Sequence, residues 1–133
     1  MKTVFADNSF YIALVNPRDE HHGRACRFAD EHQGDFVTSA WVIEELANYL
    51  CDATNRFLFL SMFEDLRSDA SVTIIPLSTD LFDRGIELYA ARPDKNWSLT
   101  DCISFSIMEQ LKLREAAATD HHFVQAGFTA LLT

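Results

Sequence analysis

Four acidic side chains in this sequence could together hold a metal ion. They are Asp7 in "VFADNSF", Glu45 in "WVIEELANYL", Asp101 in "WSLTDCISFSIM" and Asp120 in "AAATDHHF". Carboxylates that lie close together repel one another and raise each other's pKa unless a cation compensates them. Carboxylate clusters with open coordination positions suit Mg²⁺ or Mn²⁺. Whether these residues form a metal site therefore depends on whether the fold brings them to one place.

The elements that would position these acids follow from the hydrophobic pattern. Short apolar runs predict strands at 3–6, 35–39, 71–77 and 115–119, with a last turn and strand within 121–133. Helical patterns cover 8–15, 18–33, 40–51, 55–68, 79–92 and the stretch that ends at 111. Strands separated by helices of this length predict an α/β fold with three layers, in which helices flank a parallel sheet of four to five strands. Sites in such sheets gather beyond the carboxyl ends of the strands.

No repeat, low-complexity tract or Gly/Ser linker divides the chain, so we expect one domain over residues 1–133. The composition is 48% hydrophobic, which supports a real core.

Three of the acids also have an ordinary structural reading as helix caps. Asp7 precedes a helix that begins near Ser9, and Asp120 precedes a turn, so each could be an N-cap. Ser98 and Asp101 have the spacing of a capping box, with Asp in place of the usual Glu or Gln. Capping does not exclude a ligand role. It does not explain why three such acids should map to one edge of one sheet.

Helix geometry separates Glu45 from its neighbour Glu44. At 100° per residue, one apolar stripe of the helix is formed by Val42, Leu46, Tyr49 and Leu50. Glu45 falls about 60° from Val42, at the edge of that stripe, whereas Glu44 lies on the far side. A partly buried carboxylate is costly unless something positive compensates it. A Lys or Arg partner and a metal ion both satisfy this requirement.

The charge and the cysteines limit the class of protein. The formal net charge of −9 argues against a broad basic face that holds nucleic acid, but not against an enzyme that presents metal ions to phosphate. Cys26, Cys51 and Cys102 are odd in number and lack CxxC spacing, which disfavours disulfides and structural zinc and favours a reducing cytoplasm. No apolar run approaches the roughly 18 residues of a membrane span. The first residues, "MKTVFADNSF", are not typical of a signal peptide.

Other candidate groups are weaker. Adjacent histidines point in different directions on a strand or a helix, so neither His21–His22 nor His121–His122 is expected to chelate a metal as a pair. Cys102 has no evident base beside it and is expected to be a buried thiol. The aromatic run "RFLFLSMF" is expected in the core, with docking of a partner's amphipathic helix as the alternative.

Taken in order, "VFADNSF", "FVTSAWVIEEL", "WSLTDCISFSIM" and "TDHHFVQAGF" resemble the PIN-domain family of metal-dependent ribonucleases. The similarity is strongest to the toxins of VapBC toxin–antitoxin modules and their solitary relatives, and it runs from residue 3 to about 130. It implies catalytic roles for Asp7, Glu45, Asp101 and Asp120, with Ser9 in the adjoining small-hydroxyl position. It also implies that Asp7 and Asp101 hold one or two Mg²⁺ or Mn²⁺ ions, and that the other two acids act directly or through waters.

The resemblance further implies hydrolysis of RNA by in-line attack of water, leaving a 5′-phosphate and a 3′-hydroxyl. An antitoxin protein and a homodimer are the implied partners. Arg92 and Lys95 in "ARPDKNWSLTD" are the basic residues nearest in sequence to Asp101 of the predicted site. Either solvation at the surface or contact with phosphate suits them. The competing hypothesis is a binding or assembly module of the same fold with little or no nuclease activity. The charge favours this alternative, and the complete set of four acids disfavours it.

Overall fold

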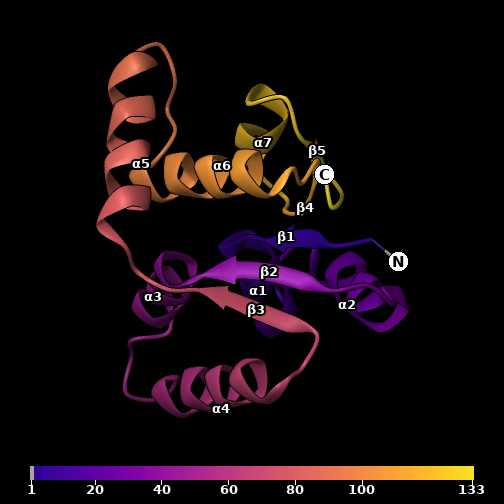
Figure 1. The fold of residues 1–133 in the computed structure, drawn as a ribbon. Helices are drawn as coiled ribbons and strands as arrows, with labels where there is room; N and C mark the ends of the chain where they lie inside the picture. Colours follow the sequence, from indigo (N-terminus) through magenta and orange to yellow (C-terminus); the bar gives the residue numbers. More distant parts are fainter. Residues whose placement is uncertain (1) are drawn as a thin grey trace.

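Five short parallel strands form the central sheet of the computed structural model, which describes residues 2–133 (Figure 1). In sequence order the strands are β1 (Val4–Ala6), β2 (Phe36–Ser39), β3 (Val72–Ile75), β4 (Glu115–Ala117) and β5 (Thr129–Ala130). Their order across the sheet is β3-β2-β1-β4-β5, and every neighbouring pair is parallel. The predicted parallel α/β sheet is therefore confirmed.

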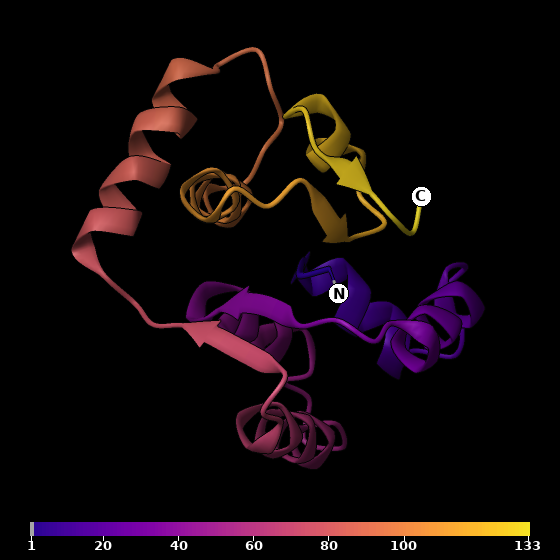
Figure 2. The same ribbon diagram turned by 45° about the vertical axis from the view of Figure 1, so that its right-hand side comes forward.

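Within residues 2–133, seven helices flank this sheet in two layers (Figures 1 and 2). One layer contains α1 (Asn8–Val15), α2 (His22–Glu31), α3 (Ala40–Tyr49) and α4 (Arg56–Ser68). The other contains α5 (Thr79–Ala91), α6 (Leu99–Leu111) and α7 (His121–Gln125). The chain moves outward from β1 to β3, then returns past β1 to β4. Because crossovers between parallel strands are almost always right-handed, this reversal puts the later helices on the opposite face.

The reversal also creates a switch point between β1 and β4, where the connections leaving the two strands lead to opposite faces of the sheet. In open α/β sheets, ligands bind in the crevice beyond the strand ends at such a point. The two strands are joined here by register pairing of Ala6 with Ala117, and the backbone N–H of Asp7 donates to the carbonyl of Ala117 at 3.1 Å. Asp7 thus lies directly at the switch point.

The core is formed around β1, β4 and α6. Phe5, Leu46, Ile103 and Phe123 are each at most 1% exposed. Helix α6 is buried on most of its circumference, as its apolar sequence predicted. It packs closely on α5, where Gly85 lies against the side chain of Ile103 with no room for a Cβ atom. The start of α6 therefore has a rigid support.

One prediction about the core was wrong. The aromatic run of α4 was expected to be buried, but Phe57 is 80% exposed and Leu60 is 60% exposed, while Phe59 and Met62 pack against the core. Tyr49, assigned above to the apolar stripe of α3, is 46% exposed. Helix α4 packs along β3 at one edge of the sheet and therefore buries only one of its two apolar sides.

The cysteines and the helices bear on the expectations about disulfides and membrane spans. Cys26, Cys51 and Cys102 are all free thiols, and Cys102 is fully buried. Among residues 2–133, no helix has the length and apolar character needed to cross a bilayer.

Candidate functional site

The four predicted acids line one cavity of about 270 Å³ at the carboxyl ends of the strands. Asp7 follows β1, Glu45 projects from α3, Asp101 lies in the first turn of α6 and Asp120 precedes α7. The complete lining is Asp7, Asn8, Ser9, Ile12, Glu45, Asn96, Ser98, Asp101, Asp120 and His122. The fold thus brings together four acids that are up to 113 residues apart in sequence, from Asp7 to Asp120.

Asp7 is both a helix cap and a buried member of this cavity. Its carboxylate accepts hydrogen bonds from the backbone N–H of Ser9 at 3.1 Å and from the Ser9 hydroxyl at 2.7 Å. The Ser9 hydroxyl also accepts from the N–H of Thr119, which ties α1 to the segment after β4. The pKa of Asp7 is raised to about 6, chiefly by burial and to a smaller extent by the charge of Asp101, against the lowering effect of the Ser9 bonds. The ionised form of Asp7 is therefore energetically unfavourable without a cation.

Glu45 points toward the same cavity, whereas Glu44 is exposed, as the helix geometry predicted. The pKa of Glu45 is raised to about 7. Burial is the largest cause, the charge of Asp7 is the next, and Asp101 and Asp120 add smaller effects, against a hydrogen bond from Thr100 that lowers the pKa. Among residues 2–133, no lysine or arginine lines the cavity. The Lys or Arg partner that could have compensated Glu45 is absent from this lining.

Asp101 forms the predicted capping box with Ser98. The N–H of Ser98 donates to the Asp101 carboxylate, the N–H of Asp101 donates to the Ser98 hydroxyl, and both distances are 3.0 Å. Burial raises the pKa of Asp101, and the nearby charge of Asp120 adds to this effect, while bonds from Ser98 and His122 oppose it. The same oxygen, Oδ2, accepts from Ser98 and lies 2.9 Å from the ring of His122. Capping and participation in the cavity are therefore compatible in one side chain.

Asp120 caps the short helix α7 by accepting the backbone N–H of His122 at 2.9 Å. All three cap readings made from the sequence are correct, and all three caps face one another across the cavity. The N-terminal ends of these helices meet at the carboxyl edge of the sheet. Helix capping alone does not explain why these acids gather at one edge of the sheet.

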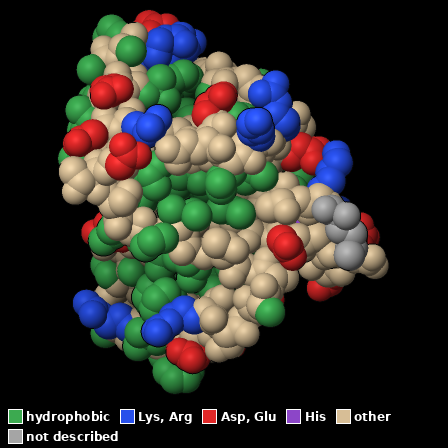
Figure 3. Space-filling view, in the orientation of Figure 1, with side chains coloured by type: hydrophobic (Ala, Val, Ile, Leu, Met, Phe, Trp, Pro, Cys, Tyr) green, Lys and Arg blue, Asp and Glu red, His purple; other side chains and the backbone are tan. Residues whose placement is uncertain are grey.

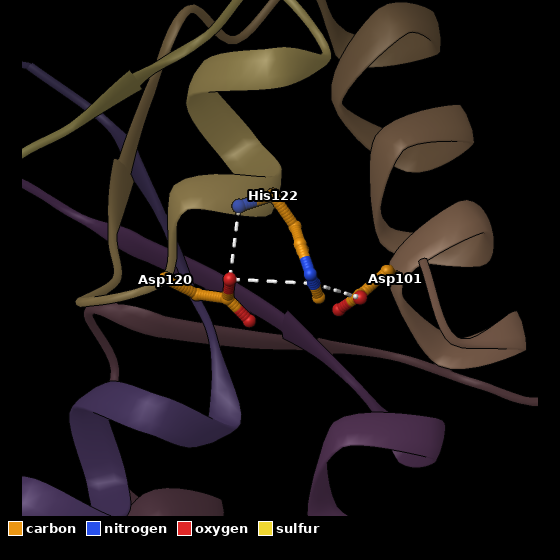
Figure 4. A group of neighbouring side chains, drawn as sticks. All are labelled: Asp101, Asp120 and His122. Atoms are coloured by element: carbon orange, nitrogen blue, oxygen red, sulfur yellow. Dashed lines mark hydrogen bonds and ion pairs between the residues drawn. The ribbon is translucent and has the colours of Figure 1, made fainter. Parts of the chain in front are cut away.

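His122 was not among the predicted site residues. Its Nδ1 lies 2.9 Å from Asp101 Oδ2 and 3.3 Å from Asp120 Oδ1. Figure 4 shows the His122 ring reaching toward the carboxylates of these two residues. One ligand atom from each of these three residues lies within 4.8 Å of the others. Adjacent histidines do not chelate a metal as a pair, but a single ring can still join two acids, as the ring of His122 does here. The signal that could have found it is its position two residues after Asp120, inside the first turn of a helix.

The group of three contains Asp101 but not Asp7, although Asp7 and Asp101 were the predicted metal ligands. Asp7 lines the cavity from the side of β1 and interacts electrostatically with Asp101 and Glu45. The role of Asp7 as a direct ligand stays a prediction.

The donor set fits a hard divalent cation. Four carboxylates, three of them with raised pKa values, face one cavity, and a cation entering it would relieve their mutual repulsion. Asn8 also lines the cavity, and its side-chain Oδ1 is buried with no hydrogen-bond partner among the described residues. An unpaired buried oxygen beside clustered carboxylates is what a bound cation with its water ligands would satisfy.

Arg92 and Lys95 lie beside this cavity in sequence but do not line it. Arg92 pairs with Asp94 at 3.0 Å and stacks over the ring of Trp97, and Lys95 lies 3.8 Å from the same carboxylate. Contact of either residue with phosphate stays a prediction.

Comparison with known proteins identifies the family. The family model of the PIN domain matches residues 4–129. The chain belongs to the PIN-domain family. It is 28% identical over 128 residues to a relative described as the 23S rRNA-specific endonuclease VapC20, from two strains of Mycobacterium tuberculosis. That alignment covers 94% of this chain and 95% of the relative.

Two solved structures share the PIN-domain fold described here. The crystal structure of Mycobacterium tuberculosis VapC20, described as a sarcin-ricin loop cleaving toxin, superimposes with a TM-score of 0.87 at 26% identity. It covers 95% of this chain and 96% of the VapC20 chain. FitAcB from Neisseria gonorrhoeae has a TM-score of 0.67 at 19% identity, covers 96% and 94% of the two chains, and is a likeness of fold alone.

Proposed function

We propose that this protein is a metal-dependent endoribonuclease, the toxin of a toxin–antitoxin pair. The observation that carries the proposal is the convergence of four carboxylates on one cavity whose lining contains no lysine or arginine. Membership of the PIN-domain family and similarity to a curated endonuclease agree with it. Buried acids with raised pKa values are costly without a cation, so their gathering in one cavity supports a metal site, and a metal-dependent nuclease is the use of such a site that agrees with the family.

In this proposal Asp7 and Asp101 hold one or two Mg²⁺ or Mn²⁺ ions. When bound, such an ion activates water and neutralises charge that develops on the phosphate oxygens. Ser98 and Ser9 orient the two carboxylates through the hydrogen bonds described above, so the ligands are held in place before the cation arrives. Glu45 and Asp120 approach from separate elements and are placed to bond water or substrate hydroxyl groups in the same cavity.

The proposed substrate is structured RNA, with ribosomal RNA as the first candidate because the curated relative is described as specific for 23S rRNA. The proposed reaction is hydrolysis of one phosphodiester bond to give a 5′-phosphate and a 3′-hydroxyl. The net charge of −9 argues against binding of RNA through a broad basic face, so recognition should depend on the shape of the RNA around the cleavage site.

We propose two protein partners for the exposed apolar surfaces. Leu77 and the α5 residues Phe82, Ile86 and Tyr89 are each 41–66% exposed, and the spacing of the last three forms one stripe along the helix. We assign this stripe to a second copy of the chain.

Figure 3 shows that hydrophobic side chains form a broad area on one face of the molecule, from its middle down to its lower end. The outer side chains of α4, such as Phe57 and Leu60, are assigned to an antitoxin helix. The cytoplasm, where ribosomes and free thiols occur together, is the proposed compartment.

The proposal is tested by incubating the protein with a panel of structured RNAs in Mn²⁺ and in excess EDTA. The panel should include a ribosomal RNA fragment that contains the sarcin-ricin loop. We expect cleavage at a defined position only with the metal, with a 5′-phosphate and a 3′-hydroxyl at the new ends. Tight Mn²⁺ binding without cleavage of any RNA in the panel would favour the binding-module hypothesis instead.

A further inference from the structure

The nitrogen of one histidine lies among the carboxylate oxygens of the cavity. His122 Nδ1 lies 2.9 Å from an oxygen of Asp101 and 3.3 Å from an oxygen of Asp120 (Figure 4). Two ligands at right angles on a metal ion with bonds of about 2.1 Å are separated by about 3.0 Å. His122 Nδ1 is therefore spaced from each of the two acids as a neighbouring ligand of the same ion would be, as well as for a hydrogen bond.

The backbone that carries His122 is held in place on both sides of the residue. Its backbone N–H is fixed by the Asp120 carboxylate at 2.9 Å, so the ring is carried by the same turn that presents Asp120. The next residue, Phe123, is fully buried, and its ring packs against Phe105 at 5.0 Å and Phe5 at 6.4 Å between centroids. A residue held in this way presents its ring to the cavity with little conformational freedom left to lose on binding.

The neighbouring His121 lies outside the cavity. It is exposed and does not line the cavity. The chain thus supplies a matched control one residue away, in the same helix and with the same side chain.

Resting on the proposed function, we propose that His122 is a direct metal ligand through Nδ1, which makes this a mixed nitrogen and oxygen site that prefers Mn²⁺ to Mg²⁺. Mg²⁺ is bound through oxygen ligands and gains little from an imidazole nitrogen, whereas transition-metal ions of the first row accept it readily. A site of carboxylates alone would discriminate weakly between these two ions. The addition of one imidazole is the feature that separates them.

The test is pulsed electron paramagnetic resonance of the protein loaded with Mn²⁺, which detects the nuclear modulation of a nitrogen bonded to the ion. We expect imidazole ¹⁴N modulation in the wild-type protein, replaced by a ¹⁵N signal after selective ¹⁵N-histidine labelling. The signal should persist in His121→Ala and disappear in His122→Ala. Absence of histidine modulation in the wild-type protein with Mn²⁺ bound would overturn the proposal and leave His122 as a hydrogen-bond partner of Asp101 only.

Isothermal titration calorimetry gives the second readout. His122→Ala should weaken Mn²⁺ binding by more than about tenfold, since even loss of a group that only supports a ligand has an effect of that size. Mg²⁺ binding should change little. Equal weakening for the two ions, or none for either, would contradict the proposed ligand role.

These readouts do not depend on RNA cleavage. Imidazole modulation in a protein that cleaves no RNA would refute the proposed nuclease and retain the ligand assignment. RNA cleavage by a protein whose bound Mn²⁺ shows no histidine signal would retain the proposed nuclease and refute the ligand assignment of His122.

Discussion

Replacing Asp7 with asparagine is expected to stabilise the metal-free protein while it abolishes cleavage. Asp7 is 5% exposed, and burial raises its pKa to about 6. The native state therefore binds the Asp7 proton more tightly than the unfolded chain does, so the wild-type protein loses stability as the pH rises from about 4 through 6. Asparagine carries no charge at any of these pH values and avoids that loss.

The size of the effect follows from the pKa. A rise from 3.8 to about 6 corresponds to about 3 kcal/mol of unfolding free energy at pH values above 7. The amide oxygen of asparagine can still accept the bonds from Ser9, but with less strength than a carboxylate. We therefore expect Asp7→Asn to be more stable than the wild type by about 1–3 kcal/mol at pH 7.5 and by much less at pH 4.5.

The assay is urea unfolding in excess EDTA at both pH values, followed by the same measurement with Mn²⁺. A cation at 100 times its dissociation constant stabilises the native state by about 2.7 kcal/mol. We expect this gain in the wild type and its loss in Asp7→Asn. Asp83→Asn, at an exposed position of α5, is the matched control and should behave as the wild type. If Asp7→Asn were less stable than the wild type in EDTA at pH 7.5, Asp7 would be a structural cap and not a destabilising member of a metal site.

Three further predictions address the site, the packing and the oligomer. Because burial and Asp7 raise the pKa of Glu45 to about 7, protons compete with the cation below that pH. Calorimetry should show Mn²⁺ affinity falling as the pH is lowered from 8 to 6, and falling less steeply in Glu45→Gln. Gly85→Ala should lower the stability by about 1–3 kcal/mol in urea unfolding despite its better helix propensity, because the added Cβ would meet the side chain of Ile103. Ile86→Asp should convert the proposed homodimer to monomer in light scattering coupled to size exclusion.

Each of these has a control in the same chain. Glu44→Gln, on the exposed side of α3, should leave the pH dependence of metal binding unchanged. Gly23→Ala, where a Cβ meets nothing within 4 Å, should be neutral or stabilising. Leu111→Asp, another exposed apolar position but outside the α5 stripe, should leave the oligomeric state unchanged. A control that changed as much as its partner variant would refute the reasoning in that case.

The sequence predicted the scaffold well because the signals involved are local. Alternating strand and helix patterns predicted all five strands and all six of the longer helices, with ends that differ from the observed ones by a few residues. The capping box of Ser98 and Asp101 and the orientation of Glu45 relative to Glu44 were also predictable, since both depend only on the geometry of a single helix. The gathering of the acids at one sheet edge followed from the parallel topology.

Features that depend on contacts between distant segments were not predicted. The position of His122 two residues after Asp120 places it near that acid, but its contact with Asp101 depends on the packing of α6 against α7, which local sequence does not report. The outward side of α4 was placed in the core because periodicity shows only that a helix has apolar residues. Periodicity cannot show whether Phe57 and Leu60 pack in the core of this chain or bind a partner protein.

The most direct test of the proposed function is single-turnover cleavage of a ribosomal RNA fragment by the wild type and by Asp101→Asn at saturating Mn²⁺. The asparagine oxygen can still accept the N–H of Ser98, so the fold is preserved while the negative charge is lost. The proposed function predicts that the wild type cleaves at a defined position and that the variant is slower by about a thousandfold or more, as expected for loss of several kcal/mol of transition-state stabilisation. Cleavage by Asp101→Asn at the wild-type rate, or wild-type cleavage that persists in excess EDTA, would contradict it.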